Sequence, residues 1–169
     1  DADNFRIYVP GGSLAQYEGA AGWQKYYQLD RLHDIAVIDG DYAIATETVE
    51  GVTRCRLLQY FGGATAVVPD RVTEIESYAF NGVAVRDVTV GDVTRIGQYA
   101  FPDSLQALTI NAKAPPALNS LALTCTPELT IKVPKALEAA YRAAEDWQNF
   151  VACLEFFEAQ EVEPPVITK

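Results

Sequence analysis

The sequence predicts a right-handed α/β solenoid, rich in β-structure, in which short strands and turns are stacked between two helices. Three observations support this prediction: a motif that recurs after 21 residues, short alternating apolar runs, and a longer segment that recurs at an offset of 124 residues. A period of about 20 residues with one strand in each repeat is typical of stacked repeat proteins.

The short repeat consists of residues 72–80, V-T-E-I-E-S-Y-A-F, and residues 93–101, V-T-R-I-G-Q-Y-A-F. A turn and a short alternating run follow each copy, and the alternation places apolar side chains on one face of a strand. The runs that follow the two copies are residues 88–90 and 108–110, and a third run of the same kind is residues 129–133. We therefore expect three short strands whose opposite face carries a ladder of threonines, formed by Thr89, Thr109 and Thr130.

The long repeat aligns residues 5–26 with residues 129–150 without a gap. Eight positions are identical: Ile7, Val9, Pro10, Ala15, Tyr17, Ala20, Trp23 and Gln24. Each copy begins with a strand-like run and continues as an amphipathic helix, which is suited to covering the open end of a stack.

The segment between the two copies is predicted to contain strands at residues 34–38, 42–47 and 52–60, because turn residues separate these runs. We divide the chain into residues 1–29, the last strand and helix of a preceding unit, residues 30–158, one repeat unit with its C-terminal helix, and residues 159–169, a proline-bearing linker.

The two motifs together resemble the BspA-type leucine-rich repeats of bacterial surface proteins. The residues that carry the resemblance are the V-T-x-I-x-x-Y-A-F blocks at 72–80 and 93–101 and the V-P…W blocks at 9–23 and 133–147. The resemblance implies a leucine-rich-repeat solenoid, export from a bacterial cell, attachment to its surface, and a role in adhesion or partner binding.

Composition narrows the choice of partners. The chain has 169 residues, with 13 Lys and Arg against 23 Asp and Glu, so its formal net charge is −10. A chain this acidic repels nucleic acid and anionic lipid, so we expect neither as a partner. No apolar run is long enough for a transmembrane helix, so this stretch is not expected to insert into a membrane. The expected partner is an extracellular protein or glycan, and the chain itself is expected to be monomeric.

The sequence shows no catalytic apparatus. His33 is the single histidine, and neither a G-x-S-x-G motif nor a phosphate-binding glycine loop is present. We therefore predict a protein that is not an enzyme and has no cofactor, no metal and no catalytic residues. Asp39-Gly40-Asp41 could supply oxygen ligands to calcium, but turn chemistry is the favoured interpretation. A glycosidase that uses a pair of acids is the least favoured alternative.

Three cysteines, Cys55, Cys125 and Cys153, are too few and too irregular for a disulfide framework. Buried free thiols are the favoured interpretation. A single disulfide is the alternative, because an exported protein meets oxidant.

The expected contact surface is the threonine ladder with its polar neighbours. Its candidate binding residues are Arg86, Asp87, Thr89, Gln106, Thr109, Asn111, Thr130 and Lys132. Tyr78 and Tyr99 are interpreted either as edges of the core or as surface residues. The predicted function is a non-enzymatic recognition module of an exported cell-surface protein, and the alternative is a structural spacer unit in a repeat array that displays another domain.

Overall fold

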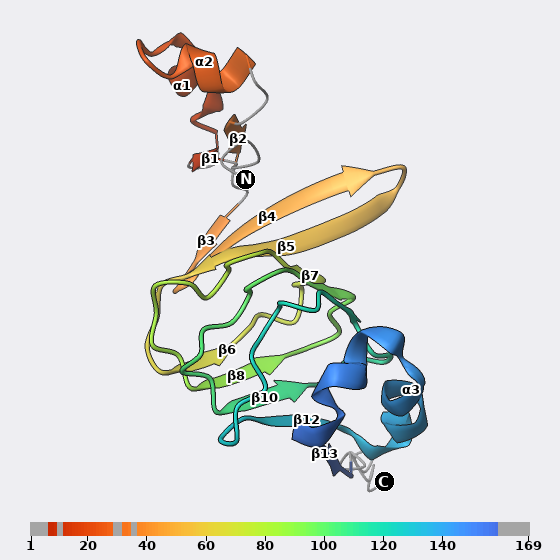
Figure 1. The fold of residues 1–169 in the computed structure, drawn as a ribbon. Helices are drawn as coiled ribbons and strands as arrows, with labels where there is room; N and C mark the ends of the chain where they lie inside the picture. The colour runs from red at the N-terminus through yellow and green to blue at the C-terminus, as the bar shows by residue number, and fades with distance from the viewer. Residues whose placement is uncertain (1–6, 10–11, 29–31, 35–36, 159–169) are drawn as a thin grey trace, which may run out of the picture.

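The computed structural model describes residues 7–9, 12–28, 32–34 and 37–158. Most of them belong to a mixed α/β arrangement with two main sheets (Figure 1). The predicted linker at residues 159–169 lies outside the described residues. Within the described part of the chain, no helix is long and apolar enough to cross a membrane.

The first main sheet has five strands, all parallel, in the order β13-β12-β10-β8-β6. Its strands are β6 (Thr65–Val67), β8 (Asp87–Val90), β10 (Ala107–Ile110), β12 (Thr130–Pro134) and β13 (Leu154–Phe157). The alternating runs of the sequence form the three central strands, and their apolar residues point into the core.

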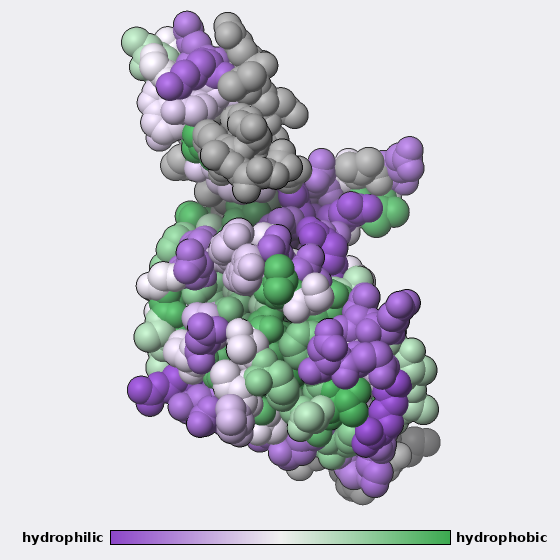
Figure 2. Space-filling model, viewed as in Figure 1, coloured by the Kyte–Doolittle hydropathy of each residue, from purple (hydrophilic) through white to green (hydrophobic). Residues whose placement is uncertain are grey.

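The second main sheet has six strands in the order β11-β9-β7-β5-β4-β3. Its strands are β3 (Val37–Asp39), β4 (Tyr42–Val49), β5 (Val52–Tyr60), β7 (Glu74–Ile75), β9 (Arg95–Ile96) and β11 (Ala117–Leu118). The β3-β4-β5 part is antiparallel, and β7, β9 and β11 continue from β5 in parallel. Figure 2 shows mainly hydrophilic side chains toward the projecting end of the β4–β5 hairpin.

The core lies between the two sheets. Residues such as Leu108 and Ile110 point inward from the parallel sheet, and Ile75 and Ile96 point inward from the mixed sheet. Three aromatic rings follow one another along the core: Tyr60 is tilted against Phe80 at a centroid separation of 5.3 Å, and Phe80 stacks on Phe101 at 5.1 Å. Phe80 and Phe101, the last residues of the two short-repeat blocks, are both buried in this core.

The prediction of a right-handed leucine-rich-repeat solenoid with two flanking helices is wrong. The described residues form a mixed α/β fold with one all-parallel and one mixed main sheet, and the helices are few and short. The prediction assigned one strand to each repeat, whereas the repeat region supplies strands to both sheets, and a long antiparallel hairpin completes one of them. Strands β7, β9 and β11 are only two residues long, too short to produce an alternating apolar pattern in the sequence.

The two segments related by the 124-residue offset share a strand-helix-strand arrangement, although their helical parts differ in type and number. The first contains β1 (Ile7–Val9), α1 (Leu14–Gly19), α2 (Gln24–Gln28) and β2 (Leu32–Asp34). The second contains β12, the 3₁₀ helix η1 (Lys135–Leu137), α3 (Glu138–Ala143), the 3₁₀ helix η2 (Glu145–Cys153) and β13. In each segment the two strands pair in parallel. We call these segments the N-terminal and C-terminal β-helix-β units, and they lie toward opposite ends of the molecule (Figure 1).

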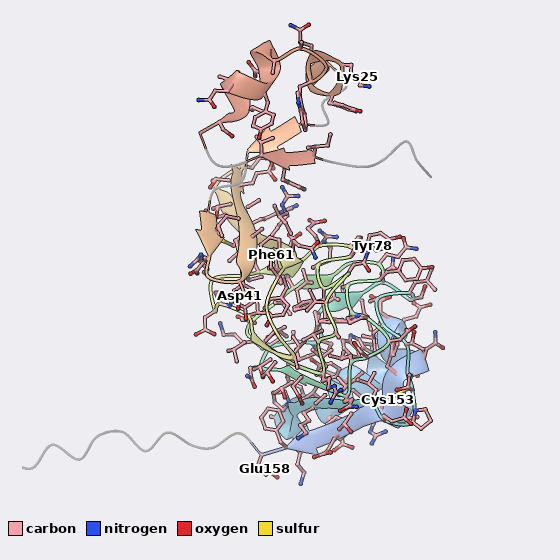
Figure 3. All side chains as sticks on the ribbon, turned by 90° about the vertical axis from the view of Figure 1, so that its left-hand side faces the viewer. Lys25, Asp41, Phe61, Tyr78, Cys153 and Glu158 are labelled. Atoms are coloured by element: carbon pink, nitrogen blue, oxygen red, sulfur yellow. A yellow bond between two sulfur atoms is a disulfide. The ribbon has the colours of Figure 1, made fainter. Side chains whose placement is uncertain are left out.

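A disulfide joins Cys125 to Cys153, with a Cα–Cα distance of 6.4 Å, and Cys55 is a buried free thiol. The expectation of free thiols therefore holds for Cys55 and is wrong for the other two cysteines. The pairing of β12 with β13 brings the turn before β12 next to the end of η2, where Cys153 lies (Figure 3). Spacing along the chain could not show this proximity.

Candidate recognition surface

The outer face of the five-stranded sheet brings the predicted binding residues together. In β8 and β10 the inward residues are buried, and the outward Asp87, Thr89 and Thr109 are exposed or half-buried. Thr130 and Lys132 occupy the corresponding outward positions of β12 and are half-buried. We call these outward positions, together with those of β6 and β13, the sheet face.

The register of the sheet face differs from the predicted threonine ladder. Thr89 lies opposite Thr109, as expected, but Thr109 lies opposite Lys132 rather than Thr130. One continuous row across the five strands therefore consists of Val67, Thr89, Thr109, Lys132 and Glu155. The predicted ladder is therefore wrong at β12, where the register is shifted by two residues.

Thr130 belongs to a second row. It lies opposite Ala107, which in turn lies opposite Asp87, and Asp87 lies opposite Thr65 on β6. The sheet face thus offers hydroxyls in both rows, together with the carboxylates of Asp87 on β8 and Glu155 on the edge strand β13 and the ammonium of Lys132 on β12. Hydroxyls both donate and accept hydrogen bonds, so this chemistry suits polar ligands such as a protein backbone or a glycan.

The remaining predicted residues lie at the two ends of the central strands. Arg86 and Gln106 precede β8 and β10, and the Gln106 N–H donates to the Arg86 carbonyl at 2.8 Å. Asn111 follows β10, where its N–H donates to the Val90 carbonyl at 2.9 Å. All three are exposed, so they extend the sheet face at its margins.

A pair of tyrosines forms a second exposed feature, on the turns that follow β7 and β9. Tyr78 and Tyr99 are 49% and 45% exposed, and their ring centroids lie 5.4 Å apart. The Tyr99 N–H donates to the carbonyl of Leu121, which is exposed on the next turn. The alternative that the tyrosines are surface residues is therefore correct, and Figure 3 labels Tyr78.

Both tyrosines have left-handed backbone conformations, with φ of 64° for Tyr78 and 50° for Tyr99. Bulky residues rarely adopt this region, and the cost is of order 1–3 kcal/mol for each residue. Nothing in the sequence signals this conformation, because turns of this kind usually carry glycine or asparagine.

A cluster of ion pairs covers the mixed sheet between β5, β7 and β9. Glu74 is only 7% exposed and accepts hydrogen bonds from Arg95 Nε and Nη2 at 3.0 and 2.9 Å. Glu76 contacts both Arg56, at 3.3 Å, and Arg95, at 2.9 Å. Partial burial alone would lower the pKa of Arg95, but its hydrogen bonds and charge interactions with the two glutamates raise it. The carboxylates and guanidinium groups pair with one another, and only Arg56 Nε is buried without a hydrogen-bond partner among the described atoms of this cluster, so we assign the cluster a structural role.

An open pocket of about 300 Å³ lies between β9, β11 and η2. Its lining includes Ser77, Gly97, Gln98, Asn119 and Asp146. Its floor is tightly packed, because a Cβ at Gly97 would lie 2.5 Å from the Ser77 nitrogen. Asp146 Oδ2 already accepts a hydrogen bond from the Leu118 N–H at 3.3 Å, so this carboxylate holds η2 against β11.

The residues considered for other chemistry lie in β2, in β3 and in the turn after β3. The Asp39 carboxylate pairs with Arg71 at 2.8 Å, and Gly40 has a left-handed φ of 55° in the turn between β3 and β4. His33 lies in β2, in register with Tyr8 of β1. Among the described residues, no group of three or more His, Cys, Asp or Glu side chains is placed to hold a metal ion.

No family model, no curated protein and no solved structure matches this chain.

Proposed function

We propose that the chain is a non-enzymatic recognition module of an exported bacterial cell-surface protein, and that it binds a protein or glycan through the sheet face. The observation that carries the proposal is the continuous row of Val67, Thr89, Thr109, Lys132 and Glu155 across five paired strands.

The physical properties of this row favour recognition. The strands are held by their ladder of backbone hydrogen bonds, and threonine is restricted at χ1, so the face is ordered before a partner arrives. Binding to an ordered surface loses less conformational entropy, which favours affinity. Lys132 and Glu155 add charges of opposite sign at one margin, which can orient a partner.

Two further observations support export. The Cys125–Cys153 disulfide is typical of proteins that fold in oxidising compartments. The resemblance to BspA-type repeats implies a bacterial surface, where adhesion and partner binding are the usual roles.

A structural spacer unit in a repeat array is the second candidate. The observation that favours it is the pair of β-helix-β units at a constant offset, because tandem units would repeat this element order along an array. A spacer would hold another domain away from the cell without using the sheet face.

A binding screen separates the two candidates. The chain would be tested against extracellular-matrix proteins and against host and bacterial glycans, beside a Thr89→Lys/Thr109→Lys variant. Thr53→Lys, on the exposed end of β5, is the matched control. A recognition module gives a saturable signal that the double variant loses and the control keeps. Silence of the folded chain across the panel, or signals that the double variant retains, would contradict recognition through the sheet face.

A further inference from the structure

The N-terminal β-helix-β unit reproduces the C-terminal unit in detail. Helices α1 and α3 have bounds that correspond at the 124-residue offset, Leu14–Gly19 and Glu138–Ala143. Both helices end in an alanine with extended backbone, Ala20 and Ala144. The tryptophan N–H that follows each alanine donates to its carbonyl, at 3.1 Å in both units.

The aromatic residues of the two units have the same geometry. Tyr17 and Trp23 pack edge to face at 5.0 Å and 81°, and Tyr141 and Trp147 do so at 4.9 Å and 82°. The third ring, Tyr26 in one unit and Phe150 in the other, lies 6.1 Å from the tryptophan in both. We call each set of three rings an aromatic cluster.

The two clusters differ in what covers them. In the C-terminal unit Tyr141 and Trp147 are 0% exposed, because they pack against the end of the core. Trp147 Nε1 donates to the Pro116 carbonyl at 2.9 Å. In the N-terminal unit α1 contains no buried residue, and Tyr17 and Trp23 are only half-buried.

The strands differ in the same way. Strand β12 pairs with β13 on one side and with β10 on the other, so the C-terminal unit continues the five-stranded sheet. Strand β1 also pairs in parallel with β2, but Ile7 lies opposite Leu32 whereas Ile131 lies opposite Leu154, so the register differs by two residues from the 124-residue offset. Among the described residues β1 pairs with no strand on the side that corresponds to β10. Within the part of the chain that the structure describes, a strand that lacks a β10-like neighbour and a preassembled aromatic cluster therefore lie together on one unit.

We propose that the N-terminal unit is a docking surface for a second sheet core of the kind that residues 37–129 form, supplied by another copy of this repeat unit. The β10-like edge strand of that copy pairs with β1, and its core end buries Tyr17 and Trp23. The occupant follows from the molecule itself, because the C-terminal unit already binds a sheet core in this way. This inference does not depend on ligand recognition by the sheet face.

The test lengthens the chain by one core. A second copy of residues 1–129, carrying Trp23→Phe, is fused in front of residue 6 of the existing chain. Residue 6 corresponds to residue 130 at the 124-residue offset, so this fusion reproduces the junction between Leu129 and β12. Trp23 and Trp147 are then the two tryptophans, as in the original chain. Their access to solvent is measured by acrylamide quenching of fluorescence and assigned with Trp→Phe variants.

In the original chain we expect one quenchable tryptophan, Trp23, and one protected tryptophan, Trp147. In the lengthened chain the quenchable component is lost, and amide hydrogens of residues 7–28 in the second copy gain protection from exchange. The matched control attaches the same added segment after residue 169, where Trp23 stays quenchable. Persistent quenching of Trp23 in the lengthened chain would overturn the inference. An added segment that stays unfolded would also count against it, because docking requires the N-terminal unit to complete that core.

Discussion

At the scale of single residues, hydrogen bonding decides which tyrosine hydroxyls stabilise the fold and which oppose it. The Tyr42 and Tyr60 hydroxyls donate to the Val67 and Thr65 carbonyls at 2.8 and 2.9 Å, so they tie β4 and β5 to β6. The Tyr141 hydroxyl, in contrast, is buried without a hydrogen-bond partner. Burial raises the pKa of all three phenols.

Tyr141 gives the first prediction. A buried hydroxyl without a partner costs about 1–3 kcal/mol, so Tyr141→Phe should raise the free energy of unfolding by about 1 kcal/mol. Tyr17→Phe, at the corresponding half-buried position, is the control and should change stability little. Urea denaturation measures both variants. A clear loss of stability in Tyr141→Phe would show that the hydroxyl has a partner.

The raised pKa values of these phenols also predict a loss of folding stability at alkaline pH. A phenol whose pKa is raised by folding stabilises the folded state below its ordinary value, near pH 10, and this contribution is lost as the pH rises further. We expect stability to decline above about pH 10, and the decline to be weaker in a Tyr42→Phe/Tyr60→Phe variant. Thermal unfolding as a function of pH tests this. An equal alkaline decline in the variant would assign the effect to other groups.

Asp92 should affect the pH dependence of stability in the opposite direction, at acid pH. Hydrogen bonds from Lys113 lower its pKa: Lys113 Nζ lies 2.7 Å from Oδ2, and the Lys113 N–H donates to Oδ1 at 3.0 Å. The stabilisation is therefore present above the ordinary pKa of the carboxyl and is lost as the pH falls below about 4. Asp92→Asn should flatten the acid limb of the stability profile, measured by thermal unfolding between neutral and acid pH. An acid limb identical to that of the unchanged chain would contradict this assignment.

At the scale of elements, the disulfide covalently links and stabilises the C-terminal β-helix-β unit. It closes a loop with a sequence separation of 28 residues, between the turn before β12 and the end of η2. The chain-entropy estimate for a loop of this size is about 3–4 kcal/mol. We predict that Cys125→Ser/Cys153→Ser lowers the free energy of unfolding by this order, and that reductant has the same effect on the unchanged chain. Insensitivity of the chain to reductant would contradict the prediction.

Equivalent substitutions in the two aromatic clusters should lower the free energy of unfolding by unequal amounts. Trp147→Ala removes a fully buried ring and should cost about 3–5 kcal/mol. Trp23→Ala removes a half-buried ring of the same geometry and should cost no more than about 1 kcal/mol. Urea denaturation of both variants measures the difference. Equal costs would mean that the N-terminal cluster is already buried in this chain.

The strands also show which features of the fold can be predicted from sequence patterns and which cannot. Alternation correctly located the strands around Val88 and Leu108, because one side of each strand faces the core. It did not give the register of β12, since Leu129, Ile131 and Val133 offer two equally apolar alignments. The structure pairs Ile131 with Leu108. The longer segment between β10 and β12 absorbs the difference, and no local pattern in the sequence records it.

At the scale of the whole molecule, the sequence predicted the repeats but not the number of sheets. The two-residue strands of the mixed sheet leave no periodic signal, and their pairing depends on the β4–β5 hairpin that they extend. The outward placement of the candidate binding residues on the strands was nevertheless predictable, because the outward positions of a strand follow directly from its inward ones. The exposed Tyr78 and Tyr99 were left undecided, because their backbone conformation is set by the surrounding turns.

The central claim is that partners bind the sheet face, and the most direct measurement is a calorimetric titration of the strongest partner from the screen. Four chains would be compared: the unchanged chain, Thr89→Lys/Thr109→Lys, the Thr53→Lys control, and Tyr78→Ser/Tyr99→Ser on the tyrosine pair. We predict that the first of these variants loses at least about 1.4 kcal/mol of binding free energy, a tenfold change in Kd. The other two should bind like the unchanged chain. Unchanged affinity in the sheet-face variant, or a loss confined to the tyrosine variant, would contradict the claim.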